Sequence, residues 1–395
     1  MGLKGGTGMH TDRTSGYVQS QVKPIIKILL GICTLAMVAL SCECDTNGSD
    51  HDKPLSLGYF KNIYDLSLSA DGNQLLFSAS GHKDYGDETI YRYEINTRKL
   101  YRYIPQGKVF IGGGRFSPRS SRFVFRIIPY DTNDKNVYED MQIGIANQDG
   151  SGFRVLTEGK GVKLHPSISR DEKMLVYFKG RILEGGSPLR KSKKKAGRLD
   201  LFKRNLSSGK EIQLTRLEFN KVSDPYFTLD GEGVVFSAYG PMRLPDTVNL
   251  DILDKFSDNY EKKYKENLIL RYPLDGSGIN LEPVPYFLHD SGSENPVLTE
   301  DGSLWFEGRE GLQGFIHYYR KLPGGTLHEI SYEELGIVHN GRFLYKFTAS
   351  PHCHKLAILN WNQNTGEKFI RILNVKTKEY LDVSMPASAE NLYLK

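Results

Sequence analysis

The stretch from Tyr64 to Ser78, YDLSLSADGNQLLFS, decides the fold of this 395-residue chain. It consists of a short strand pattern that ends in serine, an Asp-Gly turn, and an apolar strand pattern that ends in an aromatic residue. The same outline recurs as GGRFSPRSSRFVF from Gly113, HPSISRDEKMLVYF from His165, DPYFTLDGEGVVFS from Asp224, NPVLTEDGSLWFE from Asn295 and YKFTASPHCHKLAIL from Tyr345. Its turn hydroxyls, at Ser69, Ser117, Ser169, Thr228, Thr299 and Ser350, are separated by 48, 52, 59, 71 and 51 residues. Self-similarity at this period indicates a repeat architecture.

A further strand pattern and a second turn follow each start. Asp149-Gly150, Asp275-Gly276 and Gly324-Gly325 are strong hairpin signals, because such turns need positive φ. A fourth strand closes the unit, most clearly as RVLT from Arg154 and IQLT from Ile212. Four strands per unit and six units predict an all-β fold, a six-bladed β-propeller of four-stranded antiparallel blades.

These units resemble the TolB-like, WD40-like (PD40-type) propeller repeats, in which a Pro-x-Phe-Ser-Pro-Asp-Gly start is followed by an apolar strand ending in Phe. The resemblance covers residues 59–386, and the chain lacks the Trp-Asp pair of eukaryotic-type WD repeats. It implies a propeller domain over 59–386 and leaves residues 387–395 as a C-terminal tail.

The N-terminal region contains a predicted targeting signal. Ile28–Leu40 is an apolar run of 13 residues preceded by Lys23 and Lys27, which is too short to span a bilayer and is typical of a secretory signal. Ser41-Cys42 follows it directly, and this resembles a bacterial lipoprotein signal, although Ala39 stands where leucine is usual. The resemblance implies a signal peptide over 1–41, a lipid on Cys42 and a polar tether over 42–58. An ordinary cleaved signal or an N-terminal membrane anchor is the alternative.

Composition limits the partners. Lys and Arg number 52 and Asp and Glu 47, a net charge of +5, which is too balanced for a dedicated nucleic-acid binder. We expect a monomer in the bacterial cell envelope, held by the lipid on a membrane, preferably the outer membrane, and facing the periplasm or the cell surface. Four cysteines exclude a disulfide scaffold, and whether Cys44 and Cys353 pair is left open.

In a propeller, alternate loops share one face, and the long ones here are predicted to share the face opposite the tight turns. The Ala238–Asn267 insertion in the fourth unit predicts a small helix. Gly180–Arg198 is predicted to be a loop of net charge +6 that attracts anions; a solvated loop without a partner is the alternative. Its candidate residues are Arg190, Lys191, Lys193, Lys194, Lys195 and Arg198.

The starts of three successive inner strands carry polar residues before proline. They are His165, Asp224 and the pair Glu294-Asn295. Such positions surround the mouth of a propeller channel, so these four residues are predicted to bind a polar ligand there. The alternative is that they only begin strands and satisfy backbone groups.

Catalytic motifs are missing from the sequence. It contains no Gly-x-Ser-x-Gly elbow, no His-Glu-x-x-His, no P-loop and no Cys-x-x-Cys. We therefore assign no catalytic residue, no metal and no cofactor, and predict a binding or scaffold module for an envelope protein, a peptide or an anionic glycan. A polysaccharide lyase or glycan hydrolase with its site in the central funnel is the alternative.

The first prediction concerns the anchor. Cys42→Ala should abolish labelling by a radioactive or alkyne-tagged fatty acid and release the protein from membranes, because the lipid is attached to the Cys42 thiol. Fractionation and labelling of cells that produce the variant would measure this. A variant that stays wholly in the membrane fraction with its full N-terminus would contradict the lipoprotein interpretation.

Overall fold

The computed structural model divides into two compact units, Met1–Lys53 and Pro54–Lys395, and everything described below belongs to the second. It describes residues 60, 62–80, 88–119, 121–130, 138–184, 194–241, 267–278, 280–281, 293–310, 315–335, 342–350, 354–362, 368–383, 385–386 and 389–395. Within these ranges, no helix is long and apolar enough to cross a membrane.

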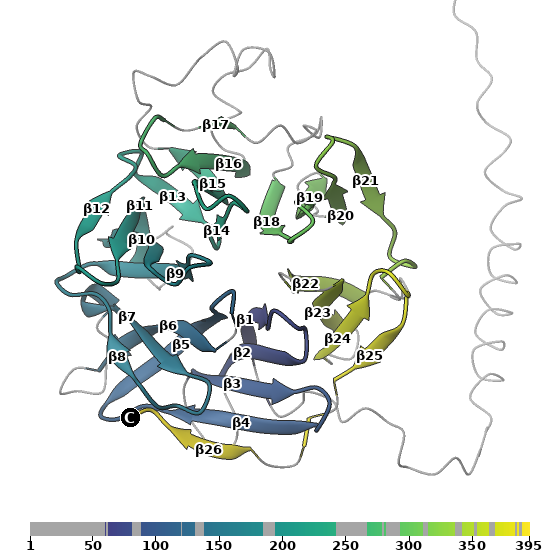
Figure 1. Cartoon of the computed structure of the whole chain (residues 1–395), viewed down its shortest axis with the longest axis horizontal. Helices are drawn as coiled ribbons and strands as arrows, with labels where there is room; N and C mark the ends of the chain where they lie inside the picture. Colours follow the sequence, from purple (N-terminus) through teal and green to yellow (C-terminus); the bar gives the residue numbers. More distant parts are fainter. Residues whose placement is uncertain are drawn as a thin grey trace, which may run out of the picture. The chain divides into compact units, whose positions relative to one another are not determined.

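The described strands form five antiparallel sheets, one of which also gains a parallel strand (Figure 1). The first repeat unit forms β1 (Asn62–Leu68), β2 (Gln74–Ser80), β3 (Thr89–Glu94) and β4 (Lys99–Ile104), and the second forms β5 (Val109–Phe116), β6 (Arg122–Pro129), β7 (Gln142–Asn147) and β8 (Arg154–Val155). The fifth unit forms β18 (Ser293–Leu298), β19 (Leu304–Glu310), β20 (Phe315–Lys321) and β21 (Leu327–Ile330). The sixth forms β22 (Arg342–Ala349), β23 (Lys355–Asn362), β24 (Lys368–Asn374) and β25 (Tyr380–Asp382).

The third and fourth units share one sheet of nine strands. It contains β9 (Val162–Ile168), β10 (Met174–Glu184), β11 (Lys194–Asn205), β12 (Glu211–Gln213), β13 (Phe219–Val222), β14 (Tyr226–Phe227), β15 (Gly233–Pro241), β16 (Asn267–Pro273) and β17 (Asn280–Leu281). Leu199 of β11 pairs with Phe219 of β13 and joins the two units. Four units therefore form separate blades, where the repeats predicted six.

The six inner strands close a ring. Contacts run from β1 to β5, β9, β14, β18 and β22 in turn, and β22 contacts β1 again. The strands of each unit follow outward from this centre (Figure 1), and the apolar core lies between neighbouring units, as where Leu76 and Tyr103 meet Phe123 and Phe125. The predicted all-β propeller with four-stranded blades is confirmed.

The last residues add a strand to the first sheet. The tail predicted at 387–395 contains β26 (Glu390–Tyr393), which pairs parallel to β4 as the fifth strand of the first sheet. Leu394 is fully buried, and its backbone N–H donates to the Ile104 carbonyl over 2.9 Å. The sequence did not predict this strand because a four-residue strand has no turn of its own to mark it.

The helix in the fourth unit stays a prediction. Most of Ala238–Asn267, the range assigned to it, lies outside the described residues. The helical element that the described residues do contain is a 3-10 turn, η2 (Tyr138–Asp140), in the second unit.

An inner-turn glycine with positive φ predicts that a residue with a side chain would be strained at that position. Gly231 has φ +76°, and a Cβ added to it would meet no atom within 4 Å, so Gly231→Ala should lower the free energy of unfolding by about 1 kcal/mol through backbone conformation alone. Gly324→Ala is the matched control, because that glycine also has open space but lies outside the left-handed region. Chemical denaturation would measure both, and equal stability of the two variants would contradict the turn assignment.

Candidate functional site

A β-bulge interrupts the inner strands near their beginnings. The register of pairing shifts between Ile63 and Leu66 in β1, Gly112 and Arg115 in β5, Glu294 and Val297 in β18, and Leu344 and Lys346 in β22. Opposite β9 it shifts between Val176 and Phe178. His165 has φ +54° and Asn295 has φ +50° at these irregularities. Bulges re-aim side chains and are frequent next to functional sites.

One residue from each unit occupies the equivalent position of the repeat beside these irregularities. It stands four positions before the turn hydroxyl, and the six residues are Asp65, Gly113, His165, Asp224, Asn295 and Lys346. We call them the axial ring. Gly113 has no side chain, and Arg126 fills its place, since a Cβ there would lie 2.6 Å from Arg126 Nε.

Asp65 is the centre of an ion network. Its Oδ1 lies 2.8 Å from Lys346 Nζ and its Oδ2 lies 3.3 Å from Arg126 Nη2, while Arg126 also contacts Glu88 Oε1 at 3.3 Å. Burial opposes ionisation of Asp65, but Lys346 and Arg126 outweigh it and lower its pKa from 3.8 to about 2. Burial raises the pKa of Glu88. The Asp65 carboxylate is thus held as a fixed anion.

Asp224 forms a second network from the opposite side of the ring. Its Oδ1 lies 2.7 Å from His165 Nδ1. Although burial opposes this, the charges of Arg115 and then His165 hold the pKa of Asp224 well below its usual range. Arg115 Nη1 donates to the Pro225 carbonyl over 2.9 Å, and its guanidinium lies 3.9 Å from the centre of the Tyr226 ring.

The predicted channel-mouth residues are placed as follows. His165 and Asp224 are in direct contact. Asn295 also lies in the axial ring, and its Nδ2 donates to Glu307 Oε2 over 3.0 Å. Glu294 pairs with Glu307 along the β18–β19 backbone, but its side chain is outside the described part of the chain.

Sequence reasoning missed Asp65 and Lys346. It searched for polar residues before proline, a pattern that only the third, fourth and fifth units carry. Counting four residues back from each turn hydroxyl would have found both.

The basic segment Gly180–Arg198 is not a loop throughout. Residues 180–184 and 194–198 extend the β10–β11 pair, so Lys194, Lys195 and Arg198 lie in a strand. Arg198 and Arg181 approach Glu218 at 3.8 and 4.0 Å, which offsets part of the positive charge. Arg190, Lys191 and Lys193, like Cys42, Cys44 and Cys353, lie outside the described residues. The loop prediction failed at both ends because polar Lys and Arg carry no strand signal.

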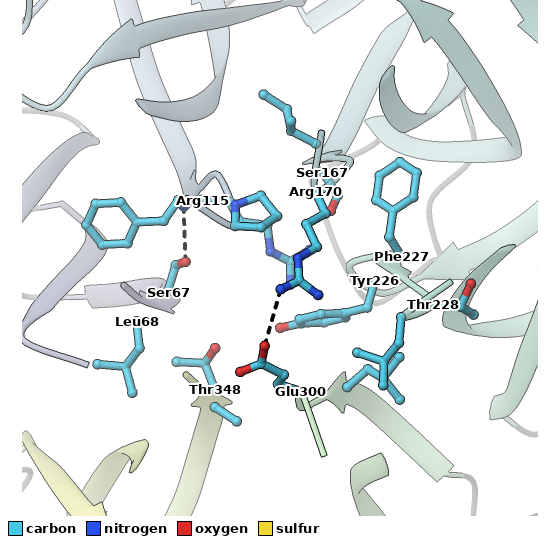
Figure 2. A pocket seen from close by; sticks show the side chains of 16 residues that line it. Ser67, Leu68, Arg115, Ser167, Arg170, Tyr226, Phe227, Thr228, Glu300 and Thr348 are labelled. Carbon is cyan, nitrogen blue, oxygen red and sulfur yellow. Dashed lines mark hydrogen bonds and ion pairs between the residues drawn. The ribbon is translucent and has the colours of Figure 1, made fainter. Parts of the chain in front are cut away.

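A hollow of about 100 Å³ lies at the other end of the axis, where the tight inner turns gather (Figure 2). All six units contribute lining residues, among them Ser67, Arg115, Ser167, Tyr226 and Thr348. Arg170 and Glu300, from the turns of the third and fifth units, form an ion pair of 3.3 Å that lies in the middle of the lining residues in Figure 2. The described residues hold no group of three or more potential metal ligands.

Comparison with known proteins places the fold. No family model and no curated protein matches the sequence. Among solved structures, TolB from Acinetobacter baumannii matches with TM-score 0.52 and 12% identity over 85% of this chain, which spans 66% of that protein. The fold is that of a TolB-like β-propeller. Oligogalacturonate lyase from Vibrio parahaemolyticus (TM-score 0.50, 15% identity, 86% of this chain and 80% of that one) and a puromycin-hydrolyzing peptidase from Mycobacterium tuberculosis (0.50, 12%, 84% and 47%) are also similar.

The ion network around Asp65 makes the stability of this propeller depend on pH in the acid range. The folded pKa of Asp65 lies below the unfolded value, so its stabilisation is complete above about pH 4 and is lost as pH falls toward 2. A shift of this size corresponds to about 2 kcal/mol. Asp65→Asn should lower the free energy of unfolding at pH 7 by about that amount and flatten its fall between pH 4 and 2.

Denaturation at a series of pH values would measure this. Glu158→Gln removes an exposed carboxylate and serves as the control. Parallel curves for Asp65→Asn and the parent protein would show that the acid sensitivity comes from other groups.

Proposed function

We propose that this chain is a lipid-anchored envelope propeller of six blades that acts as a non-catalytic binding module. Its ligand reaches the axial ring from the face that carries the long connections. The observations that support the proposal are two contacts between axial-ring residues of different units, Lys346 with Asp65 and His165 with Asp224.

The protonation states of the ring favour binding over proton transfer. A general acid or base works best with a pKa near the operating pH, whereas the pKa values of Asp65 and Asp224 are both lowered and their charges are compensated by neighbouring cations. Fixed charges and amide groups of this kind suit hydrogen bonding to a polar ligand. An envelope protein, a peptide or a glycan could each present such groups.

The long-connection face adds positive charge. β10 and β11 are the longest of the described strands. Their basic residues, together with Arg190, Lys191 and Lys193, form a basic segment. Because exposed charges act over about 8–10 Å in physiological salt, this segment would steer an anionic partner during encounter. The tether at 42–58 would leave the propeller free to face such a partner from the membrane.

A catalytic alternative has one specific observation in its favour. The contact of His165 Nδ1 with Asp224 Oδ1 orients the imidazole in the way that a carboxylate orients a histidine base. One of the fold neighbours is an oligogalacturonate lyase. A lyase or glycan hydrolase acting through His165 in the central funnel is therefore the second candidate.

Association and dissociation rates distinguish the role of the basic segment from that of the axial ring. Partners would be captured from a detergent-solubilised envelope extract, and polygalacturonate would serve as an anionic glycan probe. Replacing Lys193, Lys194 and Lys195 with Ser should slow association, most strongly at low salt, and leave thermal stability unchanged. His165→Asn or Asp224→Asn should instead raise the dissociation rate, because their contacts with a ligand would be desolvated.

Arg154→Ser, on the exposed outer strand β8, is the matched control. Binding that survives all of these changes would place the site elsewhere. Appearance of an unsaturated product from polygalacturonate, lost in His165→Asn, would favour the lyase instead.

A further inference from the structure

The hollow at the turn end of the axis is a second, differently built site. Its wall residues stand one position before the turn hydroxyls of the six units and are apolar: Leu68, Phe116, Ile168, Phe227, Leu298 and Ala349. The next level down is polar, with three hydroxyls from Ser67, Ser167 and Thr348 around one guanidinium. The hollow is thus an apolar shaft with a polar floor.

Arg115 supplies the floor with its charge. Its side chain points into the hollow (Figure 2), although the residue is only 9% exposed. One N–H donates to the Pro225 carbonyl, and the guanidinium lies over the Tyr226 ring. A guanidinium has five N–H donors, so among the described residues donors of Arg115 remain for a ligand.

The hydroxyls around Arg115 are also available. Ser167 and Thr348 are 6% and 3% exposed, and neither side chain has a hydrogen-bond partner among the residues that the structure describes. Ser67 Oγ accepts from the Phe116 backbone N–H over 3.2 Å and keeps its own O–H to donate. Three hydroxyls and one guanidinium that line the same hollow offer several N–H and O–H donors, which suit a ligand with acceptor oxygens.

The size and the walls restrict that ligand further. A single water needs roughly 10–15 Å³ of such space, so about 100 Å³ admits roughly seven to ten non-hydrogen atoms. A sugar would leave several hydroxyls without partners against Leu68, Ile168 and Leu298, which is costly. A planar carboxylate, in contrast, matches the fork of an arginine, and an apolar body matches the shaft.

We propose that the turn end of the axis binds a small monocarboxylate with an apolar body. Its carboxylate accepts hydrogen bonds from Arg115 and from the hydroxyls of Ser167 and Thr348, and its body lies between Phe227 and Leu298. The exposed Arg170–Glu300 ion pair lies across the hollow in Figure 2 and must move when a ligand enters. This site shares Arg115 with the charge network around Asp224 of the axial ring and lies apart from the long-connection face.

Two sources present the same chemistry, namely a free organic acid and the C-terminal residue of a peptide. The probes are 4-methylpentanoate, with about eight non-hydrogen atoms, and the tripeptide Gly-Gly-Leu. Each is paired with its neutral amide. Calorimetric titration of the full chain in detergent should show the acid, the tripeptide or both binding at least tenfold more tightly than the amide.

Variants locate the carboxylate. Arg115→Gln should weaken binding at least tenfold, and Thr348→Val, which keeps the volume and removes one hydroxyl, should weaken it several-fold. Arg122→Gln is the matched control: it is an arginine of the same unit that pairs with Glu172 outside the hollow, and it should bind like the parent. Thermal unfolding checks each variant, and Thr348→Val decides the matter if Arg115→Gln does not fold.

The outcomes separate clearly. Preference for the acid alone identifies a free metabolite, and preference for the tripeptide alone identifies a peptide terminus; both support the site. Any of three results would overturn the proposal. The acids and their amides could bind equally, or neither acid could bind at millimolar concentration. The third result is binding that neither Thr348→Val nor a folded Arg115→Gln changes.

Discussion

In the first, third and fourth units, the hydroxyl at the start of the inner turn sets the register of the strand pair on which the axial sites are built. Thr228 Oγ1 donates to Asp230 and accepts from the Gly233 backbone N–H over 2.9 Å, and Ser69 accepts from the Gln74 N–H in the same way. Since a slip of one residue would turn every side chain of a strand to the other face, these bonds decide which residues reach the axis. The axial ring, four residues before the turn hydroxyl, depends on them. So do Ser67, Ser167 and Thr348, which stand two residues before it.

The sixth unit uses the same hydroxyl for another purpose. Its turn lacks Asp-Gly, and Ser350 Oγ donates instead to the Ser69 and Ala70 carbonyls at 2.8 and 2.7 Å. Lys355 Nζ reaches the Gly72 carbonyl beside them, and Lys346 reaches Asp65. The changed turn of the sixth unit therefore contacts the turn of the first unit. At the outer edge of the first sheet, β26 pairs with β4.

Arg115 separates two chemically different halves of the axis. On one side lie the compensated charges of Asp65, Asp224 and Lys346, and on the other lie apolar walls and the hydroxyls of Ser67, Ser167 and Thr348. A propeller can carry two such environments because each inner strand contributes one residue to every level. Similarity to other propellers shows this scaffold only, since the same fold hosts many functions.

The sequence by itself determined the repeat, the four strands of each unit and the tight inner turns, because these depend on local periodicity and on residues that accept positive φ. It also indicated that His165 and Asp224 lie near each other, since both begin inner strands. Only the tertiary structure decided that Lys346 meets Asp65, 281 residues earlier, that Leu199 pairs with Phe219 across two units, and that the last residues form β26. The bulges and the floor around Arg115 are also decided there. Such features arise from contacts between strands far apart in the chain, which no local pattern records, and they are what turn a repetitive scaffold into particular sites.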